Sequence, residues 1–246
     1  MKIKAIILGG DRGITNGDNT PKIFKSICGI PIIQVLINCV EQAGISDIHV
    51  VVGQNAKNAK KIIAPHKVIH QTIPLGTGHA VLCAQTVLTP FDGCVIILFG
   101  DTPLIKPQTL RRMIERYQQG ADVTVLGFIP SDTRRYGRLI MGKNGLEKIV
   151  EYKEASDKER TIKLCNSGVL CINGQHILSL IQKIKNDNAA GEYYITDIVK
   201  IAKEMGLKTD IVISCANELH GINSEEELKA AEELFLSAQE RSPDND

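Results

Sequence analysis

Short apolar segments alternate with segments of helical periodicity from the first residues of the chain onward. Residues 2–8 and 95–99 are mostly apolar runs, each followed by a glycine, which is typical of strands buried on both faces of a sheet. Residues 31–43 place apolar side chains at helical spacing and are followed by Gly44. This order predicts an α/β fold with a mostly parallel central sheet and helices on both of its faces.

The strand–helix unit repeats to about residue 130, and the pattern then changes. In the first part we predict strands over residues 2–8, 48–52, 68–70, 95–99 and 123–128, and helices over residues 31–43, 55–63, 77–88 and 107–119. In the second part, Lys143-Asn144-Gly145 predicts the turn of a hairpin. The remaining expected elements are strands over residues 138–141, 146–152, 164–172 and 211–214, and helices over residues 176–185, 194–204 and 224–240. Ser224 and Glu227 fit a capping box for the last helix.

Charge and cysteine content exclude several classes of protein. The 29 basic and 28 acidic residues give a net charge of +1, which offers no electrostatic attraction to nucleic acid or to an anionic membrane. The seven cysteines are scattered and form no CxxC pair, which is typical of free thiols in a reducing compartment. No apolar run approaches the roughly 18 residues that span a bilayer, and the first apolar run is too short for a signal peptide. We therefore expect a cytoplasmic protein that binds neither nucleic acid nor membranes.

Two loops that follow predicted strands are candidates for phosphate and metal chemistry. Open α/β sheets bind ligands beyond the carboxyl ends of their strands. After the first strand, Gly9 and Gly10 would let backbone N–H groups approach a phosphate, although a glycine-rich turn is more often structural. After the strand over residues 95–99, Asp101 could hold a hard cation on a nucleotide, or it could simply cap a turn.

Other polar clusters interrupt apolar surroundings. Gly76-Thr77-Gly78, with Gln71 before it, could present donors and acceptors to a flat base, or it could only begin a helix. Four further clusters each have a structural alternative, namely a surface hairpin, a charged strand end, a strand bulge and a helix cap. They are Tyr136-Gly137-Arg138, Val150-Glu151-Tyr152-Lys153, Asn166-Ser167-Gly168 and Gly221-Ile222-Asn223.

Taken together, these motifs resemble the sugar nucleotidyltransferase family. The resemblance covers about residues 3–240 and is strongest to the N-terminal uridylyltransferase half of the bifunctional N-acetylglucosamine-1-phosphate uridylyltransferase/glucosamine-1-phosphate acetyltransferases. The most specific stretches, in order, are Pro74-Leu75-Gly76-Thr77-Gly78-His79-Ala80, Gly100-Asp101-Thr102-Pro103-Leu104-Ile105, Ile149-Val150-Glu151-Tyr152-Lys153-Glu154-Ala155 and Asn188-Ala189-Ala190-Gly191-Glu192-Tyr193-Tyr194-Ile195-Thr196-Asp197. The resemblance implies a Rossmann-like nucleotide-diphospho-sugar transferase fold with an elaborated second half that binds a sugar.

The family resemblance also implies a reaction and a set of site residues. The reaction is transfer of a uridylyl group from UTP to N-acetyl-α-D-glucosamine 1-phosphate with Mg²⁺, which gives UDP-N-acetylglucosamine and pyrophosphate. By position, Lys22 and Asp101 are catalytic residues, and Arg12 is added as the nearest candidate for a catalytic arginine. The nucleotide-binding residues are Leu8, Gly9, Gly10, Gln71, Gly76 and Thr77. The residues implied for the sugar phosphate are Gly137, Glu151, Asn166 and Thr196, and those for the metal are Asp101 and Asn223.

We expect one nucleotidyltransferase domain over residues 1–241. Its parts would be a nucleotide-binding part to about residue 130, a sugar-binding part over about residues 131–223 and a C-terminal helix over residues 224–241, with a frayed tail over residues 242–246. The sequence has none of the hexapeptide repeats of the acetyltransferase half. We therefore expect no acetyl-coenzyme A binding and no trimer built on such a repeat, and the sequence leaves the oligomeric state open.

The phosphate loop departs from the family pattern. The position that carries the family's catalytic arginine is Thr15, and a usual glycine is Asp11. The loss of an arginine removes a bidentate phosphate clamp, and Arg12 is the nearest residue that could replace it. Three hypotheses stay open: the uridylyltransferase, a related sugar-1-phosphate nucleotidyltransferase with another base or sugar preference, and a catalytically impaired nucleotide-binding regulator.

Overall fold

The computed structural model describes residues 1–10, 20–54, 56, 58–133 and 135–240. Its central sheet has the strand order β11-β7-β10-β6-β1-β4-β5. The strands of this path are β1 (Ile3–Gly9), β4 (Asp47–Gly53), β5 (Lys67–Gln71), β6 (Cys94–Phe99), β7 (Val123–Phe128), β10 (Cys165–Asn173) and β11 (Thr209–Ile213). The pairs β1–β4, β1–β6, β4–β5 and β7–β11 are parallel, whereas β10 runs antiparallel to both β6 and β7. The predicted α/β fold with a mostly parallel sheet is confirmed.

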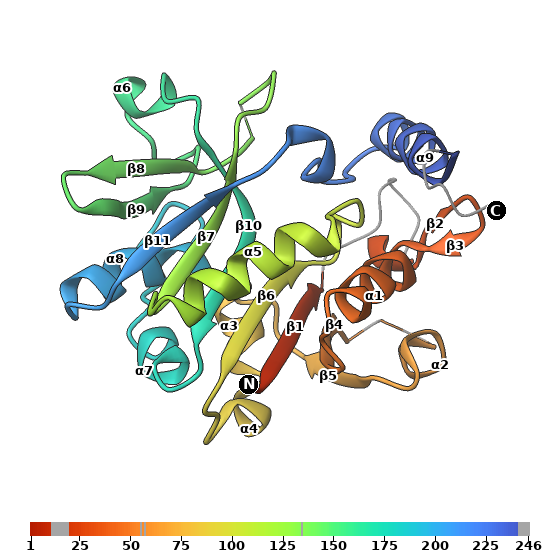
Figure 1. Cartoon of the computed structure of the whole chain (residues 1–246), viewed down its shortest axis with the longest axis horizontal. Coiled ribbons are helices and arrows are strands. Elements are labelled where there is room, and N and C mark those ends of the chain that lie inside the picture. The colour runs from red at the N-terminus through yellow and green to blue at the C-terminus, as the bar shows by residue number, and fades with distance from the viewer. Residues whose placement is uncertain (11–19, 55, 57, 134, 241–246) are drawn as a thin grey trace.

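Helices cover both faces of this sheet (Figure 1). Along β1 the side chains alternate: Ala5 and Ile7 belong to one buried cluster, and Ile6 and Leu8 to the other. The first cluster lies under α1 (Ile32–Gln42), α2 (Ala59–Ile63) and α5 (Pro107–Gln118). The second lies under α3 (Thr77–Leu82), α4 (Gln85–Leu88), α7 (Ile177–Ile181) and α8 (Ile198–Glu204). Apolar runs without alternation in the sequence are therefore strands that are buried on both sides.

The second half of the chain adds a hairpin and a bulge to the same sheet. The hairpin is formed by β8 (Arg138–Gly142) and β9 (Gly145–Val150), as predicted, and β8 also pairs with β10 through Arg138 and Cys165. The pairing of β10 with β7 shifts register between Asn166 and Leu170. This bulge presents residues 166–168 at the carboxyl ends of β1 and β6.

Several predicted boundaries are wrong. The single helix expected over residues 77–88 is two short helices, because the N–H of Ala84 bonds the carbonyl of Val81 and the tighter turn ends α3. The helix expected from residue 55 begins only at Ala59, after Asn58 in the left-handed conformation. The helix expected over residues 194–204 is a 3₁₀ turn, η2 (Ile195–Asp197), followed by α8.

Five short elements of the described chain have no counterpart in the prediction, and one of them lies at the site. They are η1 (Lys22–Phe24), the two-stranded sheet of β2 (Ser26–Ile27) and β3 (Ile30–Pro31), α6 (Asp157–Arg160) and η3 (Ala216–Glu218). Pro31 ends β3 and precedes α1 rather than lying in its first turn. The last helix, α9 (Glu225–Glu240), packs beside β2, whereas the N-terminus lies at the opposite end of β1 (Figure 1).

The thiols are all unpaired, and four of them (Cys39, Cys94, Cys165 and Cys171) are buried. Burial is the main reason that the pKa of Cys39 is raised to about 12, which makes this thiol chemically inert at neutral pH. Among the described residues, none of the helices is both long and apolar enough to cross a bilayer.

Candidate active site

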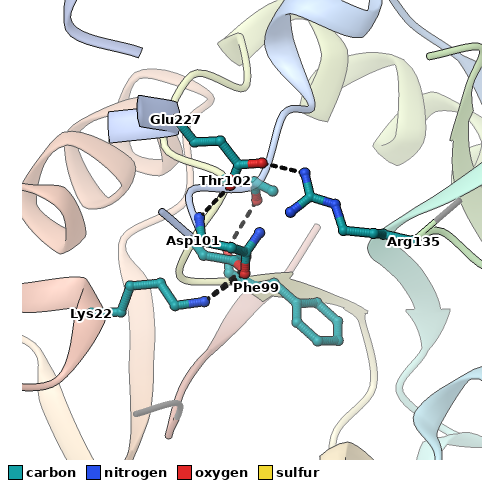
Figure 2. Close-up of polar contacts among 7 residues, drawn as sticks. Lys22, Phe99, Asp101, Thr102, Arg135 and Glu227 are labelled. Atoms are coloured by element: carbon teal, nitrogen blue, oxygen red, sulfur yellow. Dashed lines mark hydrogen bonds and ion pairs between the residues drawn. The ribbon is translucent and has the colours of Figure 1, made fainter. Parts of the chain in front are cut away.

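Lys22, Asp101 and Asn223 meet at the carboxyl edge of the sheet, although they are far apart in the sequence. Lys22 begins η1, Asp101 follows β6, and Asn223 precedes α9. The Lys22 ammonium, which is only 4% exposed, donates a hydrogen bond to Asn223 Oδ1 at 2.8 Å and lies 3.4 Å from Asp101 Oδ2 (Figure 2). The N–H of Ile222 donates to the Asp101 carbonyl at 2.9 Å and fixes the last loop against the loop after β6.

The same two oxygens suit a small divalent cation. A carboxylate and an amide oxygen are hard ligands, and here they already converge on one positive group, the Lys22 ammonium. Gly221 lies against both side chains, because an added Cβ would lie 3.3 Å from Asn223 Nδ2 and 3.4 Å from Asp101 Oδ2. No group of three or more His, Cys, Asp or Glu side chains is placed for a metal in the described parts of the chain. Two protein ligands fit Mg²⁺, which keeps several waters and binds substrate phosphates for the rest.

Gly9 and Gly10, at the end of β1, lie close to two parts of the site: η1, which carries Lys22, and Gln71, which precedes the predicted base-binding turn. Gly9 packs so closely on Ile23 that an added Cβ would lie 2.5 Å from its Cδ1. A Cβ on Gly10 would lie 3.3 Å from Gln71 Oε1, which places the end of β1 beside Gln71. The carbonyl of Leu8 accepts the N–H of Gly100 at 2.9 Å, so the loop before Asp101 is held to the end of β1.

The turn before α3 is tied to a distant loop. Gln71 Nε2 donates to the Gly76 carbonyl at 3.1 Å, and Gly78 N–H donates to the Tyr193 carbonyl at 2.7 Å. Thr77 Oγ1 accepts the N–H of Ile195 at 2.9 Å. The sequence places this turn and residues 193–195 more than 110 positions apart, and these bonds make them one wall of the site.

A cleft of about 280 Å³ opens beside Asp101 and Asn223. Its lining includes all four residues expected for the sugar phosphate together with both expected metal ligands: Gly137, Glu151, Asn166, Thr196, Asp101 and Asn223. Thr196 donates to Glu151 Oε1 at 2.8 Å, and Asn166 Oδ1 accepts the N–H of Gly168 at 3.0 Å within the bulge of β10. Of the residues predicted to bind the nucleotide, Thr77 lines the cleft as well, next to the residues predicted for the sugar phosphate. Leu8, Gly9, Gly10, Gln71 and Gly76 are not part of its lining.

Burial raises the pKa of two carboxyl groups, Glu151 in the lining of the cleft and Asp197 next to Thr196. Burial raises the pKa of Glu151, the Thr196 hydrogen bond works against that rise, and Glu154 adds to it. Burial, followed by the nearby Glu151 carboxylate, also raises the pKa of Asp197. Carboxyl groups of this kind can bind sugar hydroxyls either as donors or as acceptors.

The expected capping box of α9 forms only in half. Ser224 Oγ accepts the N–H of Glu227 at 3.2 Å, but the Glu227 carboxylate accepts the N–H of Asn223 at 2.6 Å instead of that of Ser224. The other carboxylate oxygen, Oε1, pairs with Arg135 (Figure 2). Asn223 is therefore not the side-chain cap that the sequence also allowed, because its Oδ1 accepts from Lys22.

Arg135 and Glu227 belong to the site but were missed by sequence reasoning. Glu227 was interpreted only as a helix cap. Arg135 lies in the loop after β7 that lines the cleft, and an arginine directly before Tyr136-Gly137 is the signal that could have found it. Arg138, which is fully buried, donates to the carbonyls of Tyr136 and Arg160 and holds this loop from inside. Arg12, the other expected cation, lies outside the described residues, as do Asp11 and Thr15.

A larger cavity of about 670 Å³ lies between α1, the loop after Asp101 and α9. Its walls include Val35, Cys39, Leu104 and Phe235, and it contains none of the expected site residues. We place the candidate active site in the smaller cleft, because that is where the carboxylates, the amides and the cationic side chains converge.

Comparison with known proteins points in one direction. The family described as MobA-like NTP transferase domain matches residues 5–167, more than half of the chain. The chain is 44% identical over 236 residues to the bifunctional protein GlmU of Rhodospirillum rubrum, covering 95% of this chain and 53% of the relative. It is 42% identical over 249 residues to the bifunctional protein GlmU of Roseobacter denitrificans, covering 100% of this chain and 54% of the relative. The chain thus spans about half the length of these curated relatives.

The fold has a close counterpart among solved structures. A crystal structure from Bacillus anthracis, assigned as a glucose-1-phosphate thymidylyltransferase, superposes with a TM-score of 0.75. The match covers 94% of each chain at 18% sequence identity, and it therefore supports the fold alone.

Proposed function

We propose that this chain, which belongs to the MobA-like NTP transferase family, transfers a uridylyl group from UTP to N-acetyl-α-D-glucosamine 1-phosphate. One observation carries the proposal: Thr77 of the predicted base-binding turn lines the same cleft as Glu151 and Asn166. The proposed metal ligands Asp101 and Asn223 line that cleft too. A site that joins a nucleotide to a sugar phosphate has to bring these two sets of residues together. The choice of uracil and N-acetylglucosamine rests on the motif resemblance.

The chemistry needs positioning more than acid–base catalysis. A phosphomonoester has its second pKa near about 6, so the phosphate oxygen of the sugar phosphate is largely ionised at neutral pH. That oxygen attacks the α-phosphorus of UTP, the bond to the β-phosphate breaks, and pyrophosphate leaves with its electron pair. The protein has to align two anions that repel each other and to offset the charge that grows in the transition state.

Each group of residues has a proposed task. Leu8, Gly9 and Gly10 lie along the triphosphate, and Gln71, Gly76 and Thr77 read the base. Gly137, Glu151, Asn166 and Thr196 bind the sugar phosphate. Lys22 holds a phosphate and keeps Asp101 and Asn223 in place, as its contacts at 3.4 and 2.8 Å suggest. Arg12 stays a proposed catalytic residue on sequence grounds.

Asp101 and Asn223 are the proposed ligands of Mg²⁺, whose chemistry is to neutralise phosphate charge and to orient the phosphates. The division into one domain over residues 1–241, with its nucleotide-binding and sugar-binding parts, also stays a prediction. The cytoplasm is the proposed compartment, which the unpaired thiols support.

The proposal is tested by measuring pyrophosphate release with each NTP against a panel of sugar 1-phosphates, with and without Mg²⁺. We expect the fastest turnover with UTP and N-acetylglucosamine 1-phosphate, and loss of turnover when the metal is chelated. Asp101→Asn should abolish most of the activity. Asp92→Asn is the matched control, because Asp92 lies just before the opposite end of the same strand, β6, where it bonds Gln175.

Other outcomes decide between the alternatives. A different preferred NTP or sugar phosphate would favour a related transferase. Nucleotide binding by calorimetry without turnover for any pair would overturn the enzyme proposals and favour a regulator. If Thr15 limits the rate, Thr15→Arg should raise turnover by something on the order of 100- to 1000-fold, the usual effect of one transition-state donor.

A further inference from the structure

The cleft has an excess of negative charge that the proposed reaction must overcome. Among the described residues that line it, Asp101, Glu151 and Glu192 are acidic, and Arg135 is the only cationic residue. Both proposed substrates carry several negative charges. Lys22, the nearest further cation, already contacts Asp101 and Asn223. The cleft therefore needs a cationic side chain that can contact the phosphate group of the incoming sugar phosphate.

Arg135 approaches Asp101, one of the two proposed metal ligands, from the side opposite to Lys22 (Figure 2). It directly precedes Tyr136 and Gly137, which line the sugar side of the cleft, whereas Lys22 lies next to the end of β1. Arg135 Nη2 donates to Glu227 Oε1, and the side chain remains 56% exposed. Exposed ion pairs of this kind are weak, so the guanidinium can bind a second anion without a large loss.

Glu227 connects Arg135 to Asn223, one of the two proposed metal ligands. Its Oε2 accepts the backbone N–H of Asn223 at 2.6 Å, and its Oε1 accepts from Arg135. The two oxygens of one carboxylate thus hold the guanidinium close to the backbone of Asn223.

We propose that Arg135 binds the phosphate group of the sugar 1-phosphate, with Glu227 as the positioning residue that aims its guanidinium. The planar fork of an arginine has N–H donors beyond Nη2, and these match two oxygens of a phosphate. The assignment deepens the proposed function and rests on it for the identity of the substrate. It puts one cation on each side of the reacting groups, Lys22 on the nucleotide side and Arg135 on the sugar side.

The first test measures binding, and it needs no turnover. Calorimetry with N-acetylglucosamine 1-phosphate, and NMR titration with free N-acetylglucosamine, are compared between the wild type, Arg135→Ala and Arg135→Lys. We expect Arg135→Ala to weaken the sugar phosphate roughly 10- to 100-fold, the usual effect of losing a charged hydrogen bond, and to change the free sugar less than about twofold. Arg135→Lys should retain part of the affinity, because a point charge replaces the fork.

Arg116→Ala is the matched control. Arg116 is also a half-exposed arginine in a surface ion pair, with Asp210, but it lies outside the cleft. We expect its affinity for the sugar phosphate to equal that of the wild type. The proposal is overturned if Arg135→Ala behaves like this control, if it weakens the free sugar as much as the sugar phosphate, or if the wild type does not bind the sugar phosphate.

The second test separates positioning from folding. Glu227→Gln keeps the shape of the side chain and should raise the KM for the sugar phosphate several-fold more than the KM for UTP. An equal rise in both would contradict the positioning role. Binding that depends on Arg135 without any turnover would refute the proposed function and leave this assignment standing. Turnover of UTP and N-acetylglucosamine 1-phosphate by the wild type, together with wild-type affinity for the sugar phosphate in Arg135→Ala, would support the proposed function and refute this assignment.

Discussion

Glu151, a proposed ligand of the sugar phosphate, carries an ionisation cost in the folded chain. It follows the end of β9, half-buried, and Thr196 donates a hydrogen bond to its carboxylate. Burial nevertheless raises its pKa above the ordinary value of 4.5. The ionised form is thus less favourable in the folded chain than in the unfolded one, which is the usual signature of a side chain placed for a ligand rather than for stability.

We predict that Glu151→Gln changes the pH dependence of stability. Because the pKa is raised on folding, the carboxyl contributes stability that is fully present below about pH 4.5, its unfolded value, and is lost as the pH rises through the folded value. The variant should therefore gain stability relative to the wild type over that rise, while it binds the sugar phosphate more weakly. Urea unfolding over a pH series measures the difference, with Glu147→Gln on the same strand as the control. A difference that does not vary with pH would contradict the prediction.

Single residues also show where sequence reasoning stops. Lys22, Asp101 and Asn223 could be named from their motifs, and the structure brings the three together. The only sequence signal for Arg135 is its place directly before Tyr136-Gly137, because its proposed role depends on the charge of a cleft that forms only in the folded chain. Glu227 was named for the wrong bond: its spacing from Ser224 fits a capping box, and only the folded chain offers Arg135 and the N–H of Asn223 as alternatives.

At the scale of elements, the turn into α3 depends on a contact across the site. Gly76 has a φ of +108°, and a Cβ there would lie 2.6 Å from the carbonyl oxygen of Tyr193. Backbone atoms cannot yield as a flexible side chain can. The turn and the loop at residues 192–195 therefore form one unit, and a change in either is felt by both.

We predict that Gly76→Ala weakens both the fold and nucleotide binding. A side chain in this backbone conformation costs roughly 1–3 kcal/mol, and the collision with Tyr193 adds to that cost. Gly29→Ala is the matched control, because Gly29 has a φ of +82° with nothing within 4 Å of an added Cβ. Denaturant unfolding and UTP titration of both variants compare the two effects. Equal losses of stability in the two variants would show that the contact with Tyr193 contributes nothing.

Elements defined by nearby residues could be predicted, and those defined by distant ones could not. The β8–β9 hairpin is confirmed, because Asn144 and Gly145 specify its turn locally. The break between α3 and α4 leaves no proline or glycine in the sequence to mark it. The bulge in β10 arises from its pairing with β7, about 40 residues earlier, and no local pattern encodes that register.

At the scale of the molecule, the sheet has a centre and two edges. β1 and β6 have a partner strand on each side and apolar clusters on both faces, whereas β5 and β11 end the strand order. The sequence predicts the strands of the core but not their order, in which the antiparallel β10 separates β6 from β7. That order depends on contacts between segments far apart in the chain, and such contacts leave no local signal.

We predict that backbone amides of β1 and β6 exchange with solvent more slowly than those of β5 and β11. Opening the centre of the sheet requires breaking pairs on both sides, whereas an edge strand can detach from one neighbour. Native-state hydrogen exchange with mass spectrometry measures the difference, and the hydrogen-bonded amides within each strand are compared. Amides of β5 that outlast those of β1 would place the stable centre elsewhere.

The bond between Lys22 and Asn223 joins positions 201 residues apart. During synthesis, the proposed metal ligand Asn223 is added only after all the strands of the central sheet have been made. A chain that stops before residue 223 therefore cannot form this bond, even where its strands have already paired.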